Sequence, residues 1–264
     1  MEELKFAQKI AILAYKKFVK DKDNTAKMKE NANYIGDVVT QCDLDVENFL
    51  IEEIKKKYPN DTIVSEEFNS KEKRVGRCWI IDPIDGTVNF KNNIPIWCIQ
   101  IAFCEGEQTK GALVYVPTEN KFYSADENGF YINGKPAKTS SFLKPNQSLV
   151  GMSDIVQNND EVFPIQFGLI EKLSKVVMRV RCYGSAGYEF SAVASGRLQG
   201  YIMVNPNIWD CAMGMFLCEK AGRFNLVVKN KNLYVYGAFA TEELKNLVQK
   251  CIKTILKELK KVGE

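Results

Sequence analysis

The chain is organised around one stretch, Trp79-Ile80-Ile81-Asp82-Pro83-Ile84-Asp85-Gly86-Thr87. Its apolar beginning is typical of a buried strand. Pro83 predicts that this strand ends there, because proline has a fixed φ and no backbone donor. Gly86 permits a backbone path that most residues resist, and Thr87 can cap a following helix. The stretch therefore predicts a strand-turn-helix corner that points two carboxylates and several free N–H groups into one small space.

The two carboxylates, Asp82 and Asp85, repel each other at short range unless a cation lies between them. Hard oxygen ligands of this kind suit Mg²⁺ or Mn²⁺, and free N–H groups at a helix start favour a phosphate. A metal site beside a phosphate cradle is what phosphoryl chemistry needs. An Asp-Pro turn followed by an Asp-Gly turn explains the same residues without any ligand. Spacing alone leaves both interpretations open.

The string from Asp82 to Thr87, followed by Asn89-Phe90, resembles the signature of the inositol monophosphatase family. Members of this family are metal-dependent, lithium-sensitive phosphatases. They also carry an upstream Glu-Glu pair and a downstream Trp-Asp pair. This chain has both, as Glu66-Glu67 and Trp209-Asp210. The three motifs occur in the family's order and cover most of the chain.

Composition limits the classes of function. The 264 residues are enough for one large domain or two small ones, and 45% of them are hydrophobic, as in ordinary globular proteins. A net charge of +3 is too small to favour nucleic acid as a partner. The chain has no histidine, which excludes His-based acid–base catalysis and most zinc sites.

Cysteine usage and hydropathy bear on location. The eight cysteines form no Cys-x-x-Cys motif, and most lie in apolar runs typical of reduced, buried thiols. No stretch approaches the roughly 18 apolar residues of a membrane-spanning helix, and no signal-peptide pattern opens the chain. We therefore expect a cytoplasmic protein with no membrane partner.

The first half, residues 1–140, is predicted to place two helices on an antiparallel sheet. Residues 2–20 have apolar residues at helical spacing. Residues 21–33 are polar and aperiodic, which indicates a loop or a frayed helix end, and the resemblance implies a flap near the metals. A second helix is expected after Thr40, because Thr40 and Asp43 have nearly the spacing of a capping box, with Asp in place of Glu. Strands are expected from residue 62 onward.

The second half, residues 141–264, alternates between strand and helix patterns, which indicates an α/β layer. Strands are expected at 176–181, 200–204, 224–228 and 235–240, and helices at 187–195, 211–221 and after 241. With the first half, this matches the layered α-β-α-β-α sandwich that the resemblance implies. Most metal ligands would lie in the first half, with Asp210 and the substrate contacts in the second.

The resemblance implies a site for two Mg²⁺ ions, with a third, weaker ion nearby; Mn²⁺ could replace Mg²⁺. The implied metal ligands are Glu66, Asp82, the main-chain carbonyl of Ile84, Asp85 and Asp210. Asp82 would bridge the two ions. The nucleophile would be a water activated by a metal ion, with Thr87 and Glu66 orienting it and taking its proton.

The positions of Asp43 and Asp210 at the starts of helices offer a second explanation for these two acids. The resemblance places Asp43 close to the metals, in the catalytic set, but an acid in the first turn of a helix is equally favoured by the dipole. Trp209-Asp210 at a helix start is also a plain N-cap pattern. The resemblance favours Asp210 as a metal ligand, with capping as a second role.

The implied substrate contacts include the phosphate cradle around Ile84, Asp85, Gly86 and Thr87, together with Asp210. Gly184, Ser185 and Ala186 lie between a strand and a helix, where free N–H groups could meet a substrate or simply form a connection. Met203 is a departure, because the family's inositol enzymes carry there a glutamate that binds ring hydroxyls. Methionine accepts hydrogen bonds poorly, so Met203 is either a substrate contact of a different kind or core packing.

The leading hypothesis is metal-dependent hydrolysis of a small phosphomonoester, inositol 1-phosphate or a sugar phosphate, by a homodimer. Fructose 1,6-bisphosphate and 3′-phosphoadenosine 5′-phosphate are rival substrates within the superfamily, and Val88-Asn89 favours the inositol or sugar side. A binding or regulatory protein on the same scaffold is the alternative from another class. Clustered carboxylates are costly without a metal, which argues against that alternative.

Overall fold

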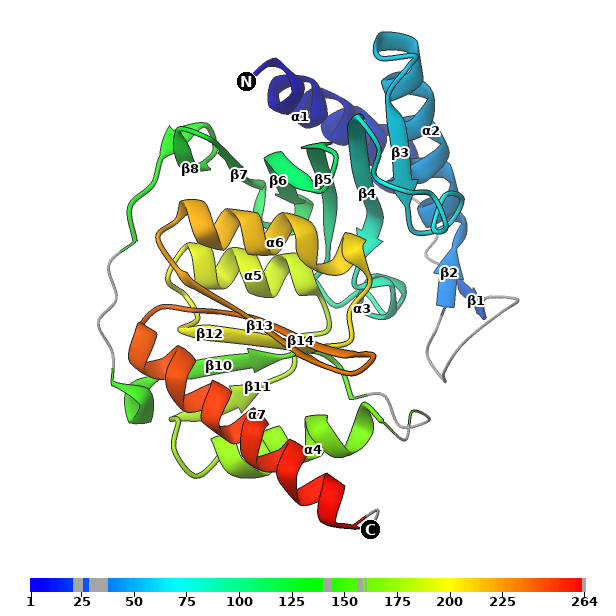
Figure 1. Ribbon diagram of the computed structural model, residues 1–264. Coiled ribbons are helices and arrows are strands. Elements are labelled where there is room, and N and C mark those ends of the chain that lie inside the picture. The colour runs from blue at the N-terminus through cyan, green and yellow to red at the C-terminus, as the bar shows by residue number, and fades with distance from the viewer. Residues whose placement is uncertain (21–25, 29–37, 140–143, 156–158, 160, 263–264) are drawn as a thin grey trace.

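A computed structural model describes residues 1–20, 26–28, 38–139, 144–155, 159 and 161–262. Its elements stack in five layers (Figure 1). Helices α1 (Glu2–Ala14) and α2 (Gln41–Lys57) cover the outer face of a seven-stranded sheet. Helices α5 (Ala186–Ala194) and α6 (Ile208–Lys220) lie between this sheet and a five-stranded one, which α4 (Phe163–Leu173) and α7 (Glu242–Val262) cover outside. The predicted α-β-α-β-α sandwich is confirmed.

The seven-stranded sheet has the order β3-β4-β5-β6-β7-β8-β9. The strands are β3 (Thr62–Ser65), β4 (Arg77–Asp85), β5 (Cys98–Glu105), β6 (Gln108–Val116), β7 (Lys121–Asp126), β8 (Gly129–Ile132) and β9 (Lys135–Pro136). Strands β3 and β4 pair in parallel, so the prediction of a purely antiparallel sheet is wrong at this edge. The connection between them returns the chain to the starting end of β3, which makes the two carboxyl ends neighbours.

The five-stranded sheet has the order β11-β10-β12-β14-β13, in which β11, β10 and β12 are parallel. The strands are β10 (Leu149–Met152), β11 (Arg179–Arg181), β12 (Gly200–Val204), β13 (Phe224–Asn230) and β14 (Leu233–Phe239). The sequence analysis did not predict β10 or α4. The carboxyl ends of parallel strands in both sheets therefore supply loops for a site.

The prediction that this strand ends at Pro83 is wrong, because strand β4 continues to Asp85. The pairing register with β5 shifts between Asp82 and Asp85, which marks a bulge. A bulge leaves a residue out of the hydrogen-bond ladder, so the missing N–H of proline costs nothing there. The bulge also increases the twist of the strand just where the two carboxylates project.

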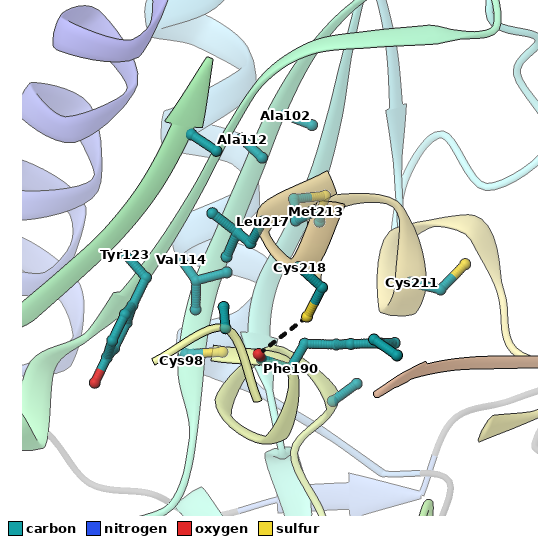
Figure 2. Close-up of a cluster of buried hydrophobic side chains, with 14 of the residues drawn as sticks. Cys98, Ala102, Ala112, Val114, Tyr123, Phe190, Cys211, Met213, Leu217 and Cys218 are labelled. Carbon is teal, nitrogen blue, oxygen red and sulfur yellow. Dashed lines mark hydrogen bonds between the residues drawn. The ribbon is translucent and has the colours of Figure 1, made fainter. Parts of the chain in front are cut away.

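The core between the sheets draws side chains from both halves of the chain. Figure 2 shows Phe190 of α5 and the α6 residues Met213, Leu217 and Cys218 packed towards the seven-stranded sheet. The Cys218 thiol donates to the Phe190 carbonyl oxygen at 3.4 Å. The division into domains near residue 140 stays a prediction, although the two sheets fall on either side of it.

Several local predictions concern the chain before the second helix. Thr40 and Asp43 form the expected capping box at the start of α2. Strand β1 (Ala26–Met28) pairs with β2 (Val38–Thr40). Residues 26–28 therefore form a strand and not the loop or frayed helix end that was predicted for them. The rest of the predicted flap, residues 21–25 and 29–33, lies outside the described residues. Among the helices that the structure describes, none combines the length and apolar content needed to cross a membrane.

Candidate active site

A cavity of about 250 Å³ opens at the carboxyl ends of the parallel strands. Its lining contains every predicted site residue except Asp43, namely Glu66, Asp82, Ile84, Asp85, Gly86, Thr87, Gly184, Ser185, Ala186, Met203 and Asp210. A larger hollow of about 520 Å³ beside Phe216 contains none of them. Residues from five separate stretches of the chain thus meet in one cavity.

Two walls of this cavity differ in chemistry. The acidic wall consists of Glu66 after β3, Asp82 and Asp85 at the end of β4, and Asp210 in the first turn of α6. The mixed wall consists of Ser153 and Asp154 after β10, Gly184 after β11, and Met203 and Asn205 at the end of β12.

Asp82 is the most constrained member of the acidic wall. It is 1% exposed, and its Oδ1 has no hydrogen-bond partner, while Oδ2 accepts a long bond from Gln100 Nε2 at 3.4 Å. Burial raises the pKa of Asp82 well above its usual range, and the charges of Glu66, Asp85 and Asp210 raise it further. A buried, unpartnered carboxylate oxygen among other carboxylates fits a cation as its missing partner.

Asp85 joins the corner to helix α5. It accepts hydrogen bonds from Ser185 Oγ at 2.6 Å, Ala186 N at 3.0 Å and Gly187 N at 2.7 Å, and from the Cys98 thiol at 3.2 Å. Burial raises its pKa, and these donors oppose the rise. The N–H of Ala186, which the sequence left open as a substrate contact or part of a plain connection, is therefore occupied by a carboxylate that satisfies the start of α5.

The corner after β4 requires a glycine at position 86 and uses the side-chain amide of Asn89. Gly86 has a φ of +91°, and a Cβ there would lie 3.0 Å from the Gly184 carbonyl oxygen, so no other residue fits without strain. The Asn89 side-chain amide donates to Ile96 O at 2.8 Å and to Tyr183 O at 2.6 Å. Both residues dock the corner onto the loop that precedes α5.

Thr87 connects the corner to Asp43. Its hydroxyl lies 3.1 Å from Asp43 Oδ1 and 3.0 Å from the Ile84 carbonyl oxygen, and can donate its single proton to one of them at a time. Asp43 also accepts the N–H and hydroxyl of Thr40. Burial raises the pKa of Asp43 to about 6, against the effect of its hydrogen bond with Thr40, and the charge of Glu66 adds to the rise. Asp43 thus lies behind the cavity lining and contacts it through Thr87.

Asp210 is the third residue of α6 and not its N-cap. Asn207 is the cap, and its backbone N–H donates to Asp210 Oδ2 at 3.0 Å, as in a capping box. Burial raises the pKa of Asp210 to about 8, and the charges of Glu66 and Asp85 contribute. The prediction that Asp210 is itself the N-cap is therefore wrong, because Asn207 holds that position. The carboxyl group of Asp210 is part of the acidic wall.

Glu47 is a residue that the sequence analysis missed. It is fully buried on α2 and accepts Ser65 Oγ at 2.6 Å, Glu67 N at 3.0 Å and Phe68 N at 2.8 Å. These bonds hold both flanks of Glu66. The available signal was its position four residues after Asp43, on the same face of a helix.

The mixed wall contains the departure noted at Met203. This side chain is 7% exposed and lines the cavity, on the strand that pairs with β10. Met203 is therefore both packed and in the cavity wall, as its two interpretations allowed. Asp154 and Ser153 went unnoticed because β10 was not predicted.

Comparison with known proteins identifies the family of the chain. The model of the inositol monophosphatase family matches residues 2–258. A fructose-1,6-bisphosphatase/inositol-1-monophosphatase of Thermotoga maritima is 31% identical over 70% of each chain, and a Nus factor SuhB of Haemophilus influenzae is 29% identical over 83% of this chain and 85% of its own.

Solved structures agree on the fold. The inositol monophosphatase (IMPase) of Thermotoga maritima matches with a TM-score of 0.79 at 24% identity, over 98% of this chain and 99% of its own. That of Anabaena matches with a TM-score of 0.79 at 22% identity, over 96% of each chain. Because the family's model spans nearly the whole sequence and its motifs meet in one cavity, the chain belongs to the inositol monophosphatase family, a family of metal-dependent phosphatases.

Proposed function

We propose that this protein hydrolyses a small phosphomonoester with the help of Mg²⁺. The observation that carries the proposal is Asp82 Oδ1, a buried acceptor without a partner, surrounded by Glu66, Asp85 and Asp210. Such a group of oxygen ligands suits a hard divalent cation. Within the described residues no acids already form a closed metal site, so the side chains would draw together on binding.

Glu66, Asp82, Asp85, Asp210 and the carbonyl oxygen of Ile84 would hold two ions, with a third near Glu66. Bound Mg²⁺ would supply water activation and charge stabilisation for the leaving oxygen. Mn²⁺ would serve in the same site because it also takes oxygen ligands.

The chain itself positions the reactants. The backbone N–H groups of Gly86 and Thr87 would bind the phosphate. The Thr87 hydroxyl, held between Asp43 and Ile84 O, would orient the attacking water, and Glu66 would take its proton. No residue needs to form a covalent intermediate.

Phosphate release with and without Mg²⁺ tests the proposal. We expect turnover of inositol 1-phosphate or a sugar phosphate with Mg²⁺, its loss in excess chelator, and its return on adding Mg²⁺ or Mn²⁺. Inhibition by Li⁺ is expected from the family resemblance. Turnover that persists in excess chelator would contradict the metal site.

A second candidate function is binding or regulation without catalysis, because one of the similar proteins is named a Nus factor. Purified protein that binds Mg²⁺ but releases phosphate from no ester would favour this candidate. A screen over inositol, fructose and nucleotide phosphates separates the two functions and also tests the rival bisphosphate substrates.

Assembly and location belong to the same proposal. Strand β11 lies at the edge of its sheet, near the exposed side chains of Val176 and Met178, which supports a homodimer through this region. All eight cysteines are free, which supports a reducing compartment such as the cytoplasm. Light scattering of the purified protein and cell fractionation would test these two points.

A further inference from the structure

We propose that Asp154 reads the leaving group of the substrate, accepting its hydroxyl groups and repelling a second phosphate. The preferred substrate is then a hydroxyl-rich monophosphate and not a bisphosphate. This inference rests on the proposed phosphatase function and concerns the mixed wall of the same cavity.

The pairing of parallel strands places Asp154, the residue after Ser153, alongside the end of β12. Met152 is opposite Ile202, and Ser153 N donates to the Ile202 carbonyl oxygen at 3.0 Å. The chain after β10 therefore runs alongside the end of β12, and both line the cavity. Asp154 thus brings a carboxylate to the same mixed wall in which Met203 offers only a thioether.

The main chain at Asp154 is fixed, while its carboxylate is available. Gln166, 1% exposed, donates through Nε2 to the Asp154 carbonyl oxygen at 2.7 Å. The carboxylate lies over Gly184, where its Oδ2 would be 3.2 Å from an added Cβ. In the described part of the chain, no hydrogen bond or ion pair engages this carboxylate, although partial burial raises its pKa.

The charges that line the cavity point to the class of leaving group. The described lining has five carboxylates, those of Glu66, Asp82, Asp85, Asp154 and Asp210, and no lysine or arginine. Metal ions can neutralise the phosphate at the acidic wall. A second phosphate at the mixed wall would find no cation among these residues and would meet Asp154, so like charges would reject it.

Hydroxyl groups fit the mixed wall better than any anion does. Each hydroxyl can donate to the carboxylate of Asp154, and a hydrogen bond to a charged group is worth about 10- to 100-fold in binding. Methionine at position 203 supplies an apolar contact but hardly accepts a hydrogen bond. Asp154 therefore takes over the acceptor role from a different strand.

Two pairs of esters separate the two roles of Asp154. Myo-inositol 1-phosphate and cyclohexyl phosphate differ in ring hydroxyls, and fructose 1-phosphate and fructose 1,6-bisphosphate differ in the second phosphate. We would measure kcat/KM for the wild type, Asp154→Ala, Asp154→Asn and the control Glu161→Gln, an exposed acid outside the cavity lining.

Asp154→Ala should lower the inositol-to-cyclohexyl ratio by about 10- to 100-fold, with cyclohexyl phosphate unchanged. Asp154→Asn keeps an acceptor oxygen but loses the charge, so it should retain only part of the inositol preference, about 2- to 10-fold. Both variants should raise the relative rate on the bisphosphate by roughly tenfold, the effect of about one pKa unit of charge interaction. Glu161→Gln should change neither ratio.

Binding titrations of the same esters with Ca²⁺ in place of Mg²⁺ give a readout that does not need turnover. If no ester is hydrolysed by the wild type, the proposed function fails, and the binding ratios still decide the role of Asp154. Ratios that are the same in the wild type and in Asp154→Ala, by rate or by binding, would overturn the inference. Wild-type preference for the bisphosphate would overturn it as well.

Discussion

The two walls of the cavity both form at the ends of parallel strands, but they differ in the burial and hydrogen bonding of their carboxylates. Each uses the carboxyl ends of parallel strands, β3 and β4 for the acidic wall and β11, β10 and β12 for the mixed wall. In the acidic wall, Asp82 and Asp85 are buried, and Asp85 accepts four hydrogen bonds. In the mixed wall, Asp154 is exposed and its carboxylate has no described partner.

This difference follows from what each wall is proposed to recognise. A metal and a phosphate are the same in every reaction of this kind, so their ligands can be held rigidly by surrounding bonds. The leaving group varies between substrates, and an open wall with few internal bonds can change without disturbing the metal ligands. We expect substitutions in the acidic wall to affect rate, and those in the mixed wall to affect substrate choice.

The largest expected effect is that of Asp82→Asn. Because Asp82 is proposed to contact both ions, we expect kcat at saturating Mg²⁺ to fall by roughly 10³-fold or more. The metal-free protein should be no less stable, since one repelling carboxylate is removed. Phosphate release and urea unfolding measure the two effects, with Asp45→Asn on the outer side of α2 as the control. Near-normal turnover would refute the assignment.

Glu47→Gln should have a smaller effect on the same wall. It weakens the bonds to Ser65 and to the backbone N–H groups of Glu67 and Phe68, which hold Glu66 in place. We expect the Mg²⁺ concentration for half-maximal rate to rise by about 10- to 100-fold, as for other groups that orient metal ligands. Glu53→Gln, on an exposed part of the same helix, is the matched control. An unchanged Mg²⁺ response would show that Glu66 does not depend on Glu47.

Met203→Glu tests the mixed wall directly. The new carboxylate should raise kcat/KM for myo-inositol 1-phosphate over cyclohexyl phosphate by about 1.5–3 kcal/mol, or on the order of 10–100-fold. The wild type should accept several hydroxyl-rich phosphomonoesters, and not myo-inositol 1-phosphate alone, at comparable rates. Met203→Leu keeps the size and apolar character, so its ratio should equal that of the wild type. If Met203→Glu does not change the ratio of kcat/KM for the two esters, Met203 does not contact the leaving group.

The last prediction concerns the pH dependence of the stability of the metal-free protein. Burial raises the pKa of Asp43 to about 6 and that of Asp210 to about 8, from ordinary values near 3.8. Between the unfolded and folded pKa values the folded state binds more protons, so its stability falls as pH rises. The decline is at most about 1.4 kcal/mol per pH unit for each group.

Urea unfolding without metal from pH 4 to pH 8.5 measures this decline. Stability should be highest at the acid end of the range, and Asp210→Asn should flatten the profile above pH 6. Mg²⁺ should reduce or reverse the slope, because it binds the ionised carboxylates. A metal-free protein that gains stability from pH 6 to pH 8 would show that the acidic wall is not strained by its own charges.

Much of the acidic wall could be predicted from the sequence, because its residues occur in short motifs whose spacing carries the chemistry. Asp82, Asp85 and Thr87 are neighbours in the chain, and Glu66 directly follows the strand before them. The layered fold was likewise predicted from the alternation of strand and helix patterns and from the family resemblance. The predictions that were wrong concern how strands pair: the bulge at Pro83, and the parallel pairing of β3 with β4 at the edge of the sheet.

The sequence by itself determined the carboxylate motifs, the capping box at Thr40 and the absence of histidine, since these are local or compositional properties. Only the tertiary structure decided that Glu47 braces the flanks of Glu66, that Asp85 satisfies the start of α5, and that Asp154 and Met203 line the same cavity. Each of these relations joins residues from different elements. No period or spacing along the chain encodes them, because they arise from the register of paired strands and the docking of helices on sheets.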